Sequence, residues 1–101
     1  LIQTNRAETA LPVLQAALSS AERALPEDHI HRNNVRRKLG ECLYQLGRTD
    51  EAEEALLAAY AALAAKAGAG HVYTRSTAET LAALYEEAGR AEAAAAWREK
   101  S

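Results

Sequence analysis

The chain has 101 residues, so it forms at most one domain with a modest core. Its formal net charge is −2, which gives no overall field that would draw nucleic acid or an anionic membrane surface. No apolar stretch approaches the roughly 20 residues that a membrane-spanning helix needs, and no signal peptide opens the chain. The single cysteine, Cys42, excludes an internal disulfide and suits a reducing compartment. We therefore expect a cytoplasmic protein.

Helical periodicity begins near the start of this alanine-rich chain, and alanine has the highest helix propensity of all residues. The first apolar face spans residues 10–25. Because Pro12 is comfortable only in the first turn of a helix, we expect this helix to begin near Thr9. A second helix is expected to open near Asn33 and to stop at Gly47, where glycine permits a turn.

Three more helices complete the predicted pattern. Thr49 is the expected N-cap of the third helix, which ends in the glycine-containing run 67–70. The fourth helix is expected after Thr74 and stops at Gly89, and the fifth covers residues 92–100. The chain is therefore all-α, with about five helices joined alternately by short turns and longer loops.

The sequence repeats itself every 42 residues. The segment LGECLYQLGRTDEAEEA, residues 39–55, returns as LAALYEEAGRAEAAAAW, residues 81–97. In the other direction, the segment that starts at Gly47 aligns with the segment that starts at Asn5. A fixed period of this length is typical of stacked repeats, in which each period is one antiparallel helical hairpin. Such arrays have a concave and a convex side and bind other polypeptides.

The repeated residues resemble tetratricopeptide repeats. The residues that carry the resemblance are Leu39-Gly40, Leu43-Tyr44, Gly47-Arg48, Ala52, Leu56 and Ala59. The resemblance implies a right-handed α-solenoid in which Gly40 and Ala52 lie where paired helices touch. The period exceeds the roughly 34 residues usual for the family and, with Gly68-x-Gly-His71-x-x-Thr74, is similar to the kinesin-light-chain-like branch. That branch usually has proline where Ile30 and Val72 stand here.

We expect residues 1–101 to form a single domain fragment. Its predicted parts are the second helix of a partial repeat (1–25), a full repeat (33–66) and a C-terminal partial repeat or cap (74–101). Arg98 replaces the apolar Leu56 of the preceding repeat in a polar tail, as the cap of a repeat array requires. Because no initiator methionine precedes Leu1-Ile2, we expect the chain to be the C-terminal part of a larger protein.

The residues that carry chemistry in other proteins form no recognisable site here. His29 and His31 are two residues apart in one loop, His71 lies at the register of His29, and Cys42 belongs to an apolar helix face. None has the paired spacing of a structural zinc site. The carboxylates form helix-surface pairs, and no nucleophile has a base with an orienting partner. We expect no metal, no cofactor and no enzymatic activity.

The resemblance also implies that the first helix of each hairpin lines a peptide-binding groove. The candidates for this groove are Asn34, Arg37, Lys38, Glu41, Tyr44, Gln45, Glu79 and Glu86. Tyr44 and Arg37 are of the residue types that dominate binding hot spots. Two alternatives stay open, since Tyr44 could lie in the seam between repeats and Arg37 could only pair with Glu41. Glu41 stands where a carboxylate-binding clamp has a neutral amide, so we do not expect that clamp.

The leading hypothesis is a non-enzymatic protein–protein interaction module that binds a peptide or a partner domain. One alternative is a structural spacer that self-associates as a homodimer through residues 1–25, where Val13, Leu14, Ala17 and Leu18 present a partly covered apolar face. A third hypothesis is nucleic-acid binding through the basic helix Arg32–Lys38. The simplest explanation of that basic run is a solvated helix face.

Overall fold

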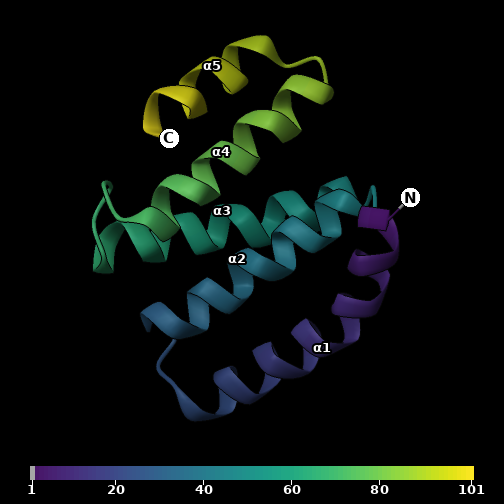
Figure 1. Ribbon diagram of the computed structural model, residues 1–101. Coiled ribbons are helices and arrows are strands. Elements are labelled where there is room, and N and C mark those ends of the chain that lie inside the picture. Colours follow the sequence, from purple (N-terminus) through teal and green to yellow (C-terminus); the bar gives the residue numbers. More distant parts are fainter. Residues whose placement is uncertain (1) are drawn as a thin grey trace.

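The protein is a stack of helices, seen in a computed structural model that describes the backbone from Ile2 to Ser101 and the side chains from Arg6 onward. The helices are α1 (Ile2–Ala24), α2 (Ile30–Gln45), α3 (Thr49–Lys66), α4 (Val72–Glu87) and α5 (Ala91–Lys100). Each helix packs on the next (Figure 1). Helix α2 also contacts α4. The predicted all-α solenoid of helical hairpins is therefore confirmed, with hairpins α2–α3 and α4–α5 following α1. Leu1, the first residue of the predicted segment 1–25, lies outside the described residues.

Both hairpin turns are built around a glycine. Gly47 has a φ of 79° and Gly89 a φ of 78°, a backbone conformation that costs a side-chain-bearing residue about 1 kcal/mol or more. Each turn closes with a backbone bond to the helix before it, from the N–H of Arg48 to the carbonyl of Leu43 (2.9 Å) and from the N–H of Arg90 to that of Tyr85 (2.9 Å). These bonds satisfy carbonyl groups that a helix end otherwise leaves unpaired. The helix ends predicted at the two glycines are confirmed.

A histidine occupies the N-cap position of the first helix of each hairpin, which the sequence analysis did not predict. The Nδ1 atom of His29 accepts a hydrogen bond from the backbone N–H of His31 (3.0 Å). The Nδ1 atom of His71 accepts the same bond from Tyr73 (3.0 Å). The starts predicted near Asn33 and after Thr74 are therefore wrong by about one turn, because histidine is not among the usual capping residues.

The predicted start of α1 near Thr9 is also wrong, because the helix continues through Pro12. Proline removes one backbone bond and crowds the carbonyl four residues earlier. The helix is held before the proline by packing, since Ala7 is buried and its carbonyl accepts a bond from the Cys42 thiol at 3.1 Å. Pro12 itself is exposed, so the affected backbone faces outward. Figure 1 shows α1 changing direction along its length, as a helix-internal proline causes.

The start of α3 differs from the prediction by one residue. Thr49 is the first helical residue, and Arg48 occupies the N-cap position without a side-chain capping bond. The Arg48 guanidinium instead forms two bonds with Glu51 in the first turn, at 2.7 and 2.8 Å. The predicted Thr49 cap is therefore wrong, and the acidic first turn is held by an exposed ion pair.

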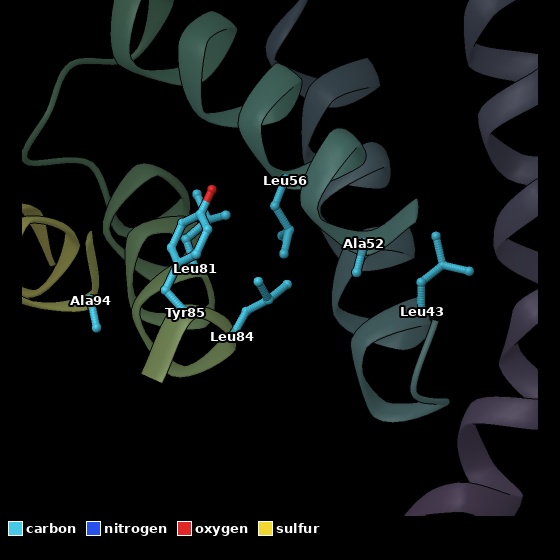
Figure 2. Packing of buried hydrophobic residues seen from close by; sticks show 7 residues of the cluster. All are labelled: Leu43, Ala52, Leu56, Leu81, Leu84, Tyr85 and Ala94. Carbon is cyan, nitrogen blue, oxygen red and sulfur yellow. The ribbon is translucent and has the colours of Figure 1, made fainter. Parts of the chain in front are cut away.

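The core lies between the hairpins and depends on one close helix contact. Its buried cluster consists of Leu43, Ala52, Leu56, Leu81, Leu84, Tyr85 and Ala94, and Figure 2 shows Leu56 and Leu84 extending toward the same space. Burying a leucine of this kind contributes roughly 1.5–3 kcal/mol. A Cβ atom added to Gly40 would lie only 2.7 Å from Cγ of Leu56. The predicted position of Gly40 and Ala52 at the hairpin contact is confirmed.

Helix α5 packs on α4 and also contacts α3. Ala94 is buried, and the Trp97 ring meets Tyr60 of α3 edge-on, with ring centroids 4.8 Å apart. Arg98, at the register of the fully buried Leu56, is exposed and forms an ion pair with Glu86. At this position α5 therefore presents a charged side chain where α3 has a buried leucine.

Candidate functional site

An open groove lies between α2 and α4, the first helices of the two hairpins. It has a volume of about 340 Å³ and is lined by Glu41, Tyr44, Gln45, Glu79, Thr80 and Ala83. We call it the inter-repeat groove. The candidates Glu41, Tyr44, Gln45 and Glu79 meet here because α2 and α4 lie side by side and each presents residues three or four positions apart.

A second, smaller groove lies on the other side of α2. This α1–α2 groove has a volume of about 180 Å³, and its lining residues are Arg6, Ala7, Ala10, Leu14, Lys38, Glu41, Cys42 and Gln45. Lys38, another predicted candidate, therefore faces α1 and not α4. Glu41 and Gln45 line both grooves and form the ridge between them.

Arg37 is buried and joins the two hairpins. Its Nη1 atom donates to Glu41 Oε2 at 2.6 Å and to Ser76 Oγ of α4 at 3.2 Å. Its Nε atom donates to Asn34 Oδ1 at 2.9 Å, and its guanidinium lies over the Tyr73 ring, 5.4 Å from the centroid. Asn34 is buried as well, so both candidates are committed to internal contacts. The arginine orients Glu41 at the groove edge and fixes α2 against α4.

Tyr44 belongs to both the seam and the groove. The ring is half-buried against the core, while the hydroxyl donates to Glu87 Oε2 at 2.6 Å. Burial, followed by the hydrogen bond and charge of Glu87, raises the pKa of Tyr44 to about 12. The hydroxyl therefore stays protonated at neutral pH and holds the Glu87 carboxylate beside α2 through its hydrogen bond.

Glu86 does not line the inter-repeat groove. It is exposed and pairs with Arg98 of α5, so its carboxylate is directed toward the terminal helix. Thr80 is a groove residue that the sequence analysis missed. It lies one helical turn from Ser76 and three residues from Ala83, so helical spacing from those positions is the signal that identifies it.

The predicted basic run does not form one patch. Arg32 donates to the carbonyl of Leu25 (3.1 Å), and Arg36 bonds to Asn33 and pairs with Glu22 at 3.7 Å. Of the four basic side chains, only Lys38 is exposed. The run is therefore neither a fully solvated face nor a stripe that could follow a phosphate backbone.

The charge of the inter-repeat groove is negative. Glu41 and Glu79 lie on its walls, and no lysine or arginine lines it. Arg37, which does not line the groove, forms an ion pair with Glu41 and compensates its charge. Glu79 has no ion-pair partner among the side chains that the structure describes. The uncompensated charge of the groove is therefore that of Glu79.

Among the described residues, no group of histidine, cysteine and carboxylate side chains is arranged to hold a metal ion. Burial raises the pKa of the Cys42 thiol, and Arg48 opposes this shift only in part. Cys42 also donates to the carbonyl of Ala7, so it is held as a thiol in the α1–α2 contact. The described side chains thus offer surfaces for binding but no arranged nucleophile.

The fold and the repeated contacts identify the class of protein. A family model described as tetratricopeptide repeat matches residues 31–101, and the chain belongs to this family. A comparison with curated proteins finds no match. Tetratricopeptide repeats generally serve as protein–protein interaction modules and are typically scaffolds without catalytic activity. No helix in the described part of the chain has the length and apolarity to cross a bilayer.

Proposed function

We propose that this chain binds another polypeptide in the inter-repeat groove between α2 and α4. The observation that carries the proposal is the groove itself, about 340 Å³ in volume and open along two helices of a tetratricopeptide array. Its walls combine a half-buried aromatic ring, Tyr44, with carboxylate, amide and hydroxyl groups. Such mixed walls supply both apolar contact and hydrogen bonds to a peptide.

The walls are held in place before any partner binds. The bonds from Arg37 to Ser76 and from Tyr44 to Glu87 join α2 to α4. The bond from Arg37 to Glu41 holds the Glu41 carboxylate at the edge of the groove. A binding surface that is already ordered loses little conformational entropy on binding. The proposed mechanism is therefore passive, with a rigid groove that presents side chains to a partner.

The charge of the groove favours a partner segment with lysine or arginine near α4. Glu79 supplies a carboxylate without an internal ion pair, and Gln45 supplies an amide on the opposite wall. Complementary charge guides the encounter and fixes the orientation of the bound segment. We propose a basic extended segment or helix as the ligand.

The proposal is tested by capturing partners with the intact protein and measuring the affinity of the partner found. Charge reversal in Glu79→Lys should weaken binding by about 1 kcal/mol or more, a loss of roughly fivefold. Gln45→Lys, which adds a cation to the facing wall, should weaken it in the same direction. Both residues are exposed, so the thermal midpoint should stay unchanged.

Glu54→Lys is the matched control, because Glu54 is exposed on α3 and does not line the groove. It makes the same change in net charge as Glu79→Lys and should leave binding intact. Normal binding by Glu79→Lys and Gln45→Lys, together with loss of binding in Glu54→Lys, would place the partner on the other side of the array and contradict the proposal.

A further inference from the structure

The histidine caps of α2 and α4 make the same hydrogen bond. Each accepts a backbone N–H through Nδ1, His29 from His31 and His71 from Tyr73, both at 3.0 Å. A histidine ring accepts at Nδ1 only while that atom carries no proton, because both nitrogens of an imidazolium are donors. The cap bond and a second proton on the ring therefore exclude each other.

The effect of acid on such a cap has a definite sign. The cap bond is complete well above about pH 6.5, where histidine side chains ordinarily titrate, and it is lost as the pH falls through that range. A cation at the start of a helix also opposes the partial positive charge of the first-turn N–H groups. Mild acid therefore removes one bond and adds one repulsive interaction at each helix start.

The His71 cap is connected to the inter-repeat groove through Tyr73. The rings of His71 and Tyr73 are in contact, with centroids 4.8 Å apart. The Arg37 guanidinium of α2 lies over the same tyrosine ring, 5.4 Å from its centroid. Arg37 in turn donates to Glu41 on the groove wall at 2.6 Å and to Ser76 of α4 at 3.2 Å. Three successive contacts thus join the cap of α4 to the edge of the groove.

Two arginines belong to the surroundings of His71. Arg37 lies on the tyrosine ring that His71 contacts, and Arg75 begins the next turn of α4, with its N–H bonded to the His71 carbonyl at 2.9 Å. The basic residue at the end of α3, Lys66, is paired with Asp28 at 3.3 Å. A proton on His71 therefore places a second cation against the ring that already carries Arg37.

The surroundings of His29 are different. It lines a pocket of about 270 Å³ together with Asp28 and Lys66, so a carboxylate is close to a protonated ring there. The Asn33 side chain donates to the carbonyls of Glu27 (2.9 Å) and His29 (3.0 Å), and these bonds do not involve the imidazole. The start of α2 therefore stays attached to the preceding loop when its cap bond is lost.

We propose that His71 makes the inter-repeat groove sensitive to pH, an inference that rests on the proposed function of this groove. While His71 is neutral, its cap holds the first turn of α4, Tyr73 supports Arg37, and Arg37 holds the Glu41 carboxylate at the groove edge. When His71 binds a proton, the first turn of α4 opens. Arg37 then loses its ring contact and Glu41 its fixed position, so the groove binds its partner more weakly in mild acid.

The conformational step is tested by NMR on the chain without a partner. The signals of the His71 ring, the Tyr73 amide and the Arg37 Nε–H group are followed from about pH 7.5 to about pH 5.5, above the range in which carboxyl groups ordinarily titrate. All three signals should shift with one midpoint. His71→Asn supplies a capping side chain that does not titrate, so the Tyr73 and Arg37 signals should then stay fixed.

His29→Asn is the matched control, because it makes the same substitution in the equivalent cap of α2. It should leave the shifts of Tyr73 and Arg37 as they are in the original chain. An Arg37 signal that does not move in the original chain, or that still moves in His71→Asn, would overturn the proposal.

The effect on binding is tested with the polypeptide that the intact protein captures. Its affinity for the original chain should fall roughly threefold or more between the two pH values, as expected for the loss of a helix cap. His71→Asn should bind equally at both pH values, and His29→Asn should keep the original dependence. Groups that titrate on the captured polypeptide affect all three proteins alike. An equal fall in affinity for the original chain and His71→Asn would overturn the proposal.

Failure of the proposed function is seen separately. Normal binding by Glu79→Lys together with loss of binding in Glu54→Lys would place the captured polypeptide outside the groove. The Arg37 signal of the chain alone still decides whether protonation of His71 reaches the groove edge.

Discussion

Helices α2 and α4 occupy the same place in successive hairpins, yet their equivalent residues have different roles. Both begin with a histidine cap and end before a glycine in the left-handed conformation. Arg37 of α2 is buried in a polar network, whereas Glu79, its counterpart 42 residues later, is exposed on the groove wall. The difference arises because Arg37 reaches Ser76 and Tyr73 of the following first helix, α4, whereas no following first helix packs beside Glu79 in the described structure. The repeat preserves the caps and turns of the helices, and the neighbouring helices determine whether an equivalent residue is buried or exposed.

The largest expected effect on stability concerns the close contact between Gly40 and Leu56. Gly40→Leu should lower the free energy of unfolding by about 3 kcal/mol, because Leu56 has no room to move away from the new side chain. Gly40→Ala should also destabilise, although alanine occupies the equivalent position 82 of α4. Urea denaturation followed by circular dichroism measures both. Gly70→Ala is the control, since no atom lies near its added Cβ, and unchanged stability of Gly40→Leu would contradict the contact.

The second prediction compares the contributions of Arg37 and Glu79, which occupy equivalent positions of the repeat, to stability. Arg37→Ala should cost about 2 kcal/mol, because it leaves buried Asn34 and the partly buried Glu41 without their charged donor. Glu79→Ala, at the equivalent register, should change stability by less than about 0.5 kcal/mol. Arg37→Ala is therefore a poor probe of partner binding, unlike the exposed Glu79. Equal stability of the two variants would show that the network around Arg37 contributes nothing.

The histidine caps should contribute equally to the two hairpins. His29→Ala and His71→Ala should each cost about 1 kcal/mol, since each leaves one backbone N–H of the first turn unpaired. Asparagine at either position should restore most of the loss. His31→Ala is the control, because only its backbone takes part in the cap. A loss confined to one of the two histidines would mean that the caps are not equivalent.

The smallest effect concerns alkaline pH and the tyrosines of the two helices. Burial, then the Glu53 hydrogen bond, raises the pKa of Tyr85 to about 12, as burial and Glu87 do for Tyr44. A raised folded-state pKa means that the folded protein holds the proton more tightly than the unfolded chain. The contribution of each tyrosine is therefore complete below about pH 10, the ordinary tyrosine pKa, and falls as the pH rises toward 12.

Denaturation curves at pH 9 and pH 11 measure this loss. Tyr44→Phe and Tyr85→Phe should each reduce the decline in stability between the two pH values, because phenylalanine has no proton to lose. A decline of the same size in the double variant would assign it to other groups, and the two hydroxyl contacts would then have no part in it.

Several features follow from the sequence because they depend on neighbours along the chain. The 42-residue period predicts stacked hairpins, and glycine at positions 47 and 89 predicts the turns, since only glycine takes a positive φ without strain. Helical spacing also predicts that Glu41, Tyr44 and Gln45 share one face. The histidine caps were missed because their capping bond depends on ring orientation at the helix start, although their shared register was visible.

Only the tertiary structure decided which of these positions are free to bind. The sequence gives Arg37 and Glu79 equivalent registers, but packing buries the first and exposes the second. Ala17 and Ala59 are the same residue in the same pattern, and one is exposed while the other is fully buried. Pro12 predicts a helix start that the contacts of Ala7 with α2 override. A pattern along the chain specifies a face, and the physical reason why that face is covered or open is the presence or absence of a neighbouring helix.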